Sequence, residues 1–200
     1  GQVLQEPYTV RKARVVVREM AESAALDLLD KRMVTDQLVL TIGYDTASLS
    51  NEDARTTYKG EVKTDYYGRK VPKHAHGTAN LESPTSSARL ISEAVMELFD
   101  RIVNPKLLVR RINLTTNHVV DEETAAKNPS PVQYDLFTDY EALERKQREE
   151  KERLAKERQI QTAILNIKKQ FGKNAILKGL NYEEGATAKE RNEQIGGHKA

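Results

Sequence analysis

Apolar and polar positions recur along the first 120 residues with two different periods, and these periods predict an order of strands and helices. Residues 2–6 are extended in character. Pro7 and Thr9 then predict a stop and an N-cap for a helix from Val10 to Arg32. Its apolar residues recur every three or four positions, as in an amphipathic helix: Ala13, Val17, Met20, Ala24 and Leu28.

A period of two begins at Asp36 and predicts a strand whose core face holds Leu38, Leu40, Ile42 and Tyr44. Residues 45–65 are polar and have no sustained period, so we expect an exposed, mobile loop. Alternation returns from Tyr66 to Leu81, where Pro72 indicates an edge strand or a bulge. One face of this strand holds Ala75, Gly77, Ala79 and Leu81, and the other holds His74, His76, Thr78 and Asn80.

A second helix and a last strand complete the pattern. Ser83 and Pro84 supply a cap and a first-turn proline, and the helix ends before Asn104. Its apolar stripe is Ile91, Val95, Leu98 and Ile102. The strand from Leu108 to Val119 places Ile112 and Leu114 opposite Arg111, Asn113, Thr115 and Asn117.

The resulting order is strand, helix, strand, strand, helix, strand, which is the split βαβ arrangement of ferredoxin-like domains. We therefore expect an α+β fold over residues 1–120: a four-stranded βαββαβ sheet with both helices on one face. The other face is left to polar side chains and is open to a partner.

The character of the chain changes after Asp121. Residues 121–139 are rich in Pro, Asn and acid and are expected to form a linker. Residues 140–171 are expected to form a long charged helix that serves mainly as a solvated spacer, since 13 of the 18 residues from 141 to 158 are charged. A short apolar stripe near its end predicts either packing or contact with a partner, at Ile160, Ile164, Ile167 and Phe171. Residues 172–200 are rich in Gly and charge and are expected to form a flexible, loop-like tail.

Composition narrows the classes of function. The chain has 200 residues and a net charge of +2, and it contains no cysteine, which excludes disulfides, thiol catalysis and cysteine-based metal sites. No apolar run approaches the roughly 18 residues of a membrane span, so we expect a cytoplasmic protein with no membrane partner. Motifs for serine hydrolases, P-loops, dinucleotide binding and zinc proteases are absent. Because the chain begins with Gly1 in strand-like sequence, we expect it to be part of a longer protein.

Local charge is more informative than the total. Residues 66–81 carry three Lys or Arg and no acid, and residues 101–120 carry four and no acid. Cationic, hydroxyl and imidazole donors on one sheet face suit phosphate oxygens, which favours sequence-independent contact with a nucleic-acid backbone. Ordinary solvated strand faces are the alternative. The pair His74 and His76 lacks further metal ligands nearby, so no metal site is predicted. The candidate nucleic-acid-binding residues are Lys70, Lys73, His74, His76, Thr78, Arg110, Arg111, Asn113 and Thr115.

The sharpest short motif is QYDLF in the linker: Gln133, Tyr134, Asp135, Leu136 and Phe137. An exposed Leu-Phe pair gains nothing from water, so it predicts burial in the pocket of a partner protein. The alternative is that Leu136 and Phe137 fold back onto the domain.

Several stretches resemble the C-terminal part of Y-family translesion DNA polymerases of the UmuC/DinB type. They are GQVLQEPY, TVRKARVVVREMAESAALDLL, VTDQLVLTIGYD, YGRKVPKHAHGTANLESPTSSARLI and VRRINLTTNHVV. The resemblance implies a little-finger domain that lays its sheet in the major groove of damaged or primer-template DNA. It also implies that QYDLF docks in the sliding clamp, although Tyr134 stands where a leucine is usual.

The same resemblance implies a role in DNA repair, damage tolerance and the SOS response. Nothing in the chain resembles the part of the polymerase that binds Mg²⁺ and dNTPs, so this fragment is expected to hold no cofactor and to be inactive alone. A rival interpretation is a protein-interaction adaptor that binds no nucleic acid, in which the charged helix is the functional element. A small α+β enzyme is a more distant third.

Overall fold

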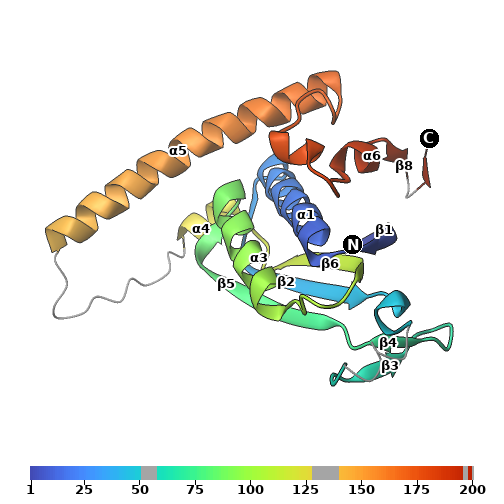
Figure 1. Cartoon of the computed structure of the whole chain (residues 1–200). Helices are drawn as coiled ribbons and strands as arrows, with labels where there is room; N and C mark the ends of the chain where they lie inside the picture. Colours follow the sequence, from blue (N-terminus) through green and yellow to red (C-terminus); the bar gives the residue numbers. More distant parts are fainter. Residues whose placement is uncertain (51–57, 128–139, 196–197, 200) are drawn as a thin grey trace.

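Four long strands form one antiparallel sheet in the spatial order β1-β6-β2-β5. The computed structural model describes residues 1–50, 58–127, 140–195 and 198–199 (Figure 1). A short fifth strand, β7 (Val120–Asp121), pairs with the start of β2. The long strands are β1 (Gln2–Tyr8), β2 (Met33–Tyr44), β5 (Ala75–Thr85) and β6 (Val109–Asn117).

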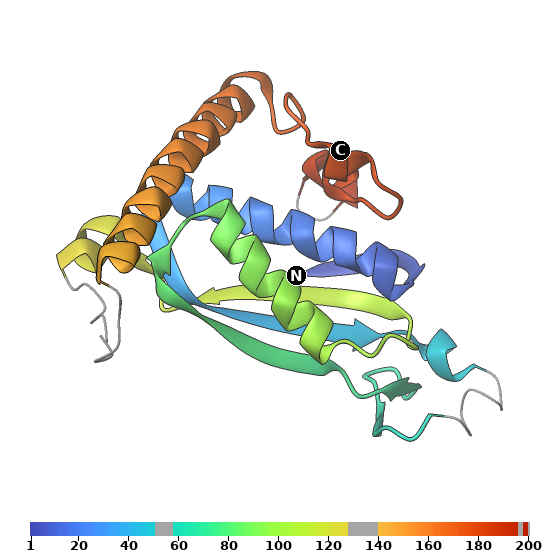
Figure 2. The same cartoon turned by 60° about the vertical axis from the view of Figure 1, so that its left-hand side comes forward.

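Two helices, α1 (Val10–Asp30) and α3 (Ala88–Ile102), cover one face of this sheet (Figure 2). The α+β class and the predicted element order are confirmed. Thr9 caps α1 as predicted, because its side chain accepts a hydrogen bond from the backbone N–H of Lys12. The predicted start of the second helix is wrong: β5 continues through Pro84, and Ser87 is the N-cap. An edge strand tolerates the missing N–H of proline.

The strand order differs from the ferredoxin-like one. A ferredoxin-like sheet has the first and third strands of the βαββαβ unit in its centre. Here the central strands are β2 and β6, the second and fourth long strands, and β1 and β5 lie at the edges. The order of elements in the sequence does not decide between the two arrangements, since both allow two helices to cover one face.

The core lies between the sheet and the two helices. The predicted core face of β2 is confirmed, with Leu38, Leu40 and Ile42 fully buried. Ile91, Val95 and Leu98 of α3 are buried as well. Gly77 lets α3 approach β5 closely, because a Cβ there would lie 2.8 Å from a methyl carbon of Leu98.

The segment between β2 and β5 is more regular than the loop predicted for residues 45–65. It begins with a 3₁₀ helix, η1 (Thr46–Leu49), and Leu49 is buried. A separate hairpin follows, made of β3 (Val62–Thr64) and β4 (Lys70–Pro72). A strand of three residues is too short to produce a detectable period, which explains why β3 was not predicted. The single strand predicted from Tyr66 to Leu81 is wrong, since β4 with Pro72 pairs with β3 in the hairpin and β5 begins only at Ala75.

The C-terminal part contains a long helix, α5 (Tyr140–Phe171), as predicted. It is preceded by α4 (Glu122–Lys127) and followed by η2 (Gly179–Tyr182), α6 (Ala188–Asn192) and a small hairpin of β8 (Gln194–Ile195) and β9 (His198–Lys199). Within the residues that the structure describes, no helix is long and apolar enough to cross a membrane.

The tail after α5 packs against α1 rather than forming the loop-like segment that composition predicted. Glu19 of α1 is only 3% exposed, and its carboxylate accepts hydrogen bonds from the backbone N–H groups of Thr187 and Ala188 and from the Asn181 amide. These bonds join a helix near the start of the chain to the segment that follows α5. The sequence did not predict this contact, because a buried carboxylate does not appear in the pattern of apolar residues.

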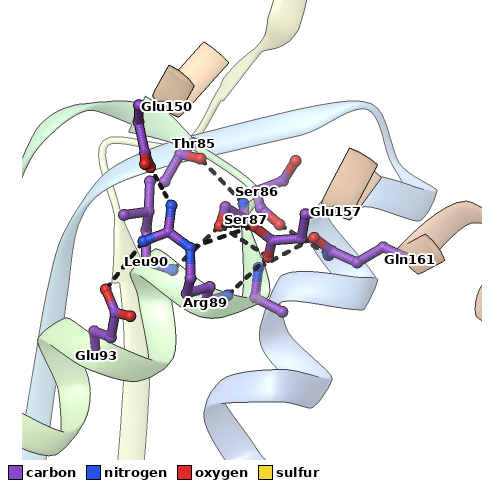
Figure 3. Close-up of polar contacts among 10 residues, drawn as sticks. Thr85, Ser86, Ser87, Arg89, Leu90, Glu93, Glu150, Glu157 and Gln161 are labelled. Atoms are coloured by element: carbon purple, nitrogen blue, oxygen red, sulfur yellow. Dashed lines mark hydrogen bonds and ion pairs between the residues drawn. The ribbon is translucent and has the colours of Figure 1, made fainter. Parts of the chain in front are cut away.

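The contacts between α5 and the domain are polar. Glu157 accepts hydrogen bonds from the Ser87 hydroxyl and the Arg89 backbone N–H, and Gln161 accepts one from the Ala88 N–H (Figure 3). α5 therefore satisfies the free N–H groups at the start of α3. Within the predicted apolar stripe, Ile164 is half-buried, whereas Ile160, Ile167 and Phe171 are exposed and do not pack on the domain. Contact of these exposed residues with a partner stays a prediction.

Candidate functional site

Helices α1 and α3 leave the opposite face of the sheet uncovered (Figure 2), and the strand register places the predicted polar residues on that face. The register places β2 between the two strands singled out from sequence. Thr41 of β2 lies opposite His76 of β5 and Asn113 of β6. In the next row, Val39 lies between Thr78 and Thr115. Because directly paired residues of an antiparallel sheet share a face, these four predicted residues lie together.

The central strand adds polar groups that the sequence analysis did not include in the site. The Gln37 amide donates to Asn80 and accepts from Asn117, both at 3.0 Å. Thr41 Oγ1 lies 2.9 Å from His76 Nδ1. These bonds fix the side chains before any partner arrives. The alternation of β2 could have indicated Gln37 and Thr41, since they occupy the positions between its core residues.

Arg111 is the guanidinium at the end of this face. Arg111 is exposed and pairs with Gly43 of β2. A Cβ added at Gly43 would lie 3.2 Å from the Cβ of Arg111. Among the described residues, no acidic side chain pairs with it. An unpaired guanidinium beside amide and hydroxyl groups is a donor set that matches phosphate oxygens.

Arg110 is placed differently from Arg111. The β2–β6 register shifts between Gly43 and Tyr44, so that Val109 and Ile112 are both buried and Arg110 occupies the bulge between them. Its guanidinium donates to the carbonyl oxygen of Gln5 at 2.9 Å and lies 3.7 Å from the Asp45 carboxylate. Arg110 is thus held at the end of the sheet by groups of the chain itself.

Lys70 and Lys73 belong to the β3–β4 hairpin and its exit, and not to the sheet face. Lys70 donates to Thr64 Oγ1 at 2.9 Å, and Lys73 pairs with Glu61 at 2.6 Å. The hydrogen bond from Lys73 lowers the pKa of Glu61, and the charges of Lys73 and Lys63 lower it further. The structure therefore divides the predicted residues among the open face, the bulge that holds Arg110, and the hairpin with its exit, where His74 lies between β4 and β5.

Other candidate sites are metal-binding groups, clefts and the predicted partner motif. In the described part of the chain, no group of three or more His, Asp or Glu side chains could hold a metal ion. Two clefts, of about 640 and 570 Å³, lie on the helical side, where α5 meets α1. The predicted partner motif at residues 133–137 lies outside the described residues.

One protein family matches more than half of the chain. The family model described as impB/mucB/samB family C-terminal domain matches residues 2–130. The match spans the whole sheet with α1, α3 and α4. None of the curated proteins that were compared with the chain matches it.

Proposed function

Because the chain belongs to the impB/mucB/samB family and contains the C-terminal, little-finger region of a Y-family polymerase, we propose that its open sheet face binds the phosphate backbone of DNA. The observation that carries the proposal is the polar face itself. Hydroxyl, amide, imidazole and guanidinium groups of three strands lie there, on the side that α1 and α3 leave uncovered. Such groups position a protein on DNA without reading its sequence.

The dimensions of the face support contact across a groove. Four strands give three spacings of about 4.8 Å, or about 14 Å before side chains are added. The major groove is about 12 Å wide and admits an α-helix or a two-stranded ribbon. A sheet of this width is too broad to enter the groove completely, so its side chains would contact phosphates on both sides. Base specificity should therefore be weak.

Arg111 provides the test. We expect fluorescence anisotropy with a labelled duplex to show binding that weakens as salt rises, with a log–log slope of about −0.9 for each neutralised phosphate. Arg111→Ala should weaken binding and make the slope shallower by about one such unit. Arg11→Ala is the matched control, since Arg11 is exposed on α1, on the helix-covered side. Equal affinity of the wild-type chain and the Arg111 variant would reject the face as the DNA contact and favour the adaptor interpretation.

We further propose that QYDLF, at residues 133–137, binds the processivity clamp. The support is the sequence motif and its position in the interval between α4 and α5. Leu136→Ala with Phe137→Ala should abolish binding of the chain to a purified clamp in a surface plasmon resonance experiment. The same variant should bind duplex DNA normally. Unchanged clamp affinity would rule out this motif as the contact.

A further inference from the structure

The β3–β4 hairpin presents two tyrosine rings to solvent at its tip. Tyr66 is 97% exposed and Tyr67 is 77% exposed. The rings stand edge to face, with centroids 5.4 Å apart and an interplanar angle of 87°. Large exposed aromatic groups that lie together commonly mark an interaction surface. Neither the open sheet face nor the clamp motif accounts for them.

The turn that carries these rings is internally braced. The Asp65 carboxylate accepts hydrogen bonds from the backbone N–H groups of Tyr67 and Arg69, both at 2.9 Å, and from Arg69 Nε at 2.8 Å. Gly68 adopts a φ of +78°, which a side chain would disfavour. The rings are therefore held out from the hairpin by a defined turn, which lowers the ordering cost of binding a ligand.

The charge around the tip suits a polyanion. Residues 58–74 contain five Lys or Arg against two acids. Both acids are already paired, Glu61 with Lys73 and Asp65 with Arg69. The Arg69 guanidinium lies 5.2 Å from the Tyr67 ring centroid, which places a cation beside this ring. The Tyr66 ring is exposed to solvent. Aromatic rings within a cationic surface are the features that bind the bases and backbone of single strands.

The position of the hairpin relates it to the open face. It contacts η1 and β2 at the end of the sheet where β5 begins (Figure 1). This is the same end of the sheet as Arg110 and Arg111. A duplex lying on the face would leave the sheet beside the hairpin. Paired bases inside a duplex offer no free ring face to a tyrosine, whereas an unpaired base does.

We propose that Tyr66 and Tyr67 form a stacking platform for unpaired bases of a DNA strand that extends beyond the duplex on the sheet face. The inference rests on the proposed function, because the duplex must be bound for the extension to reach the hairpin. Lys70 and Lys59 would attract the backbone of the extension. A basic partner protein is disfavoured by the net positive charge of the hairpin.

The test compares two labelled DNA probes, a blunt duplex and the same duplex with a single-stranded thymidine extension. The wild-type chain should bind the extended probe more tightly. Tyr66→Ala with Tyr67→Ala should weaken binding of the extended probe by at least about fivefold, given typical base–aromatic stacking, and change blunt-duplex affinity less than twofold. Tyr66→Phe with Tyr67→Phe keeps both rings and should behave like wild type.

Tyr182→Ala is the matched control, because Tyr182 is 71% exposed in the C-terminal tail. It should leave both affinities unchanged. A second readout does not depend on variants: photo-crosslinking from 5-bromodeoxyuridine in the extension should label Tyr66 or Tyr67. An equal loss on both probes, no loss on either, or crosslinks elsewhere would overturn the platform. Failure of wild type to bind the blunt duplex would instead reject the proposed function of the face.

Discussion

Gly77 lies where α3 crosses β5, and the space above it is already filled. An alanine Cβ would lie 2.8 Å from Leu98 Cδ1 and 2.9 Å from Ile102 Cγ2. We expect Gly77→Ala to lower the free energy of unfolding by about 1–3 kcal/mol, as overpacking usually does. This exceeds the gain of up to about 1 kcal/mol from a less flexible unfolded chain. Urea denaturation measures the change, and Gly179→Ala, which meets no atom within 4 Å, should not lower the free energy of unfolding and should raise it by up to about 1 kcal/mol.

Individual residues differ in how well the sequence predicted them. Leu38, Leu40 and Ile42 were predicted correctly, since burial of alternate positions is a direct consequence of strand geometry. Arg110 was grouped with Arg111 on the basis of charge. A bulge that places both Val109 and Ile112 in the core depends on pairing with β2, and the sequence of one strand does not contain that information.

At the scale of elements, two side chains of α5, Glu157 and Gln161, accept hydrogen bonds from the first backbone N–H groups of α3. We expect Glu157→Ala with Gln161→Ala to expose the backbone N–H groups of Ala88 and Arg89, because both lose their acceptors. The lost capping should cost about 1 kcal/mol. Hydrogen exchange at these two amides should become faster. Glu152→Ala with Gln159→Ala removes the same residue types from exposed positions of α5 and should have no effect. Equal exchange rates of the Ala88 and Arg89 amides in the two double variants would contradict the contact.

The hairpin turn should be sensitive to acid through Asp65. The hydrogen bond from the Arg69 side chain, followed by the bonds from the backbone N–H groups of Arg69 and Tyr67, lowers the pKa of this carboxyl below its ordinary 3.8. A carboxyl with a lowered folded-state pKa stabilises above its unfolded-state pKa, and the stabilisation is lost as pH falls through the folded-state value.

The amide chemical shifts of Tyr67 and Arg69 should therefore change in an acid transition whose midpoint lies below pH 3.8. Asp65→Asn should loosen the turn at neutral pH and remove the acid transition. A transition centred above 3.8 would show that the carboxylate does not brace the turn.

Long elements were predictable, and the contacts between distant elements were not. The strands and helices of the sheet domain have enough residues to show a period. The charged helix was predicted from composition, yet its docking by Glu157 and Gln161 was not, because polar side chains on a polar helix look like a solvated surface. The open face was predicted in part, since strand alternation shows which residues share a face but not which strand lies between them.

At the scale of the whole molecule, Glu19 holds the C-terminal tail on the domain. Glu19→Ala leaves the N–H groups of Thr187 and Ala188 without their acceptor, which should cost about 1–3 kcal/mol. We expect the tail to detach, so that trypsin cleaves faster after Lys178 and Lys189. Glu97→Ala, at an exposed position of α3, is the control. A cleavage rate equal to that of wild type would mean that other contacts suffice to hold the tail.

The two prolines of the sheet occupy its two edge strands, Pro7 in β1 and Pro84 in β5. A proline cannot donate the hydrogen bond that an added strand needs, and edge prolines are a known defence against aggregation. The Arg101 side chain also occupies the carbonyl oxygen of Thr78 in β5. Strand addition by a second copy or by an extended peptide is therefore disfavoured at both borders, and the sheet can stay soluble while its broad polar surface remains accessible.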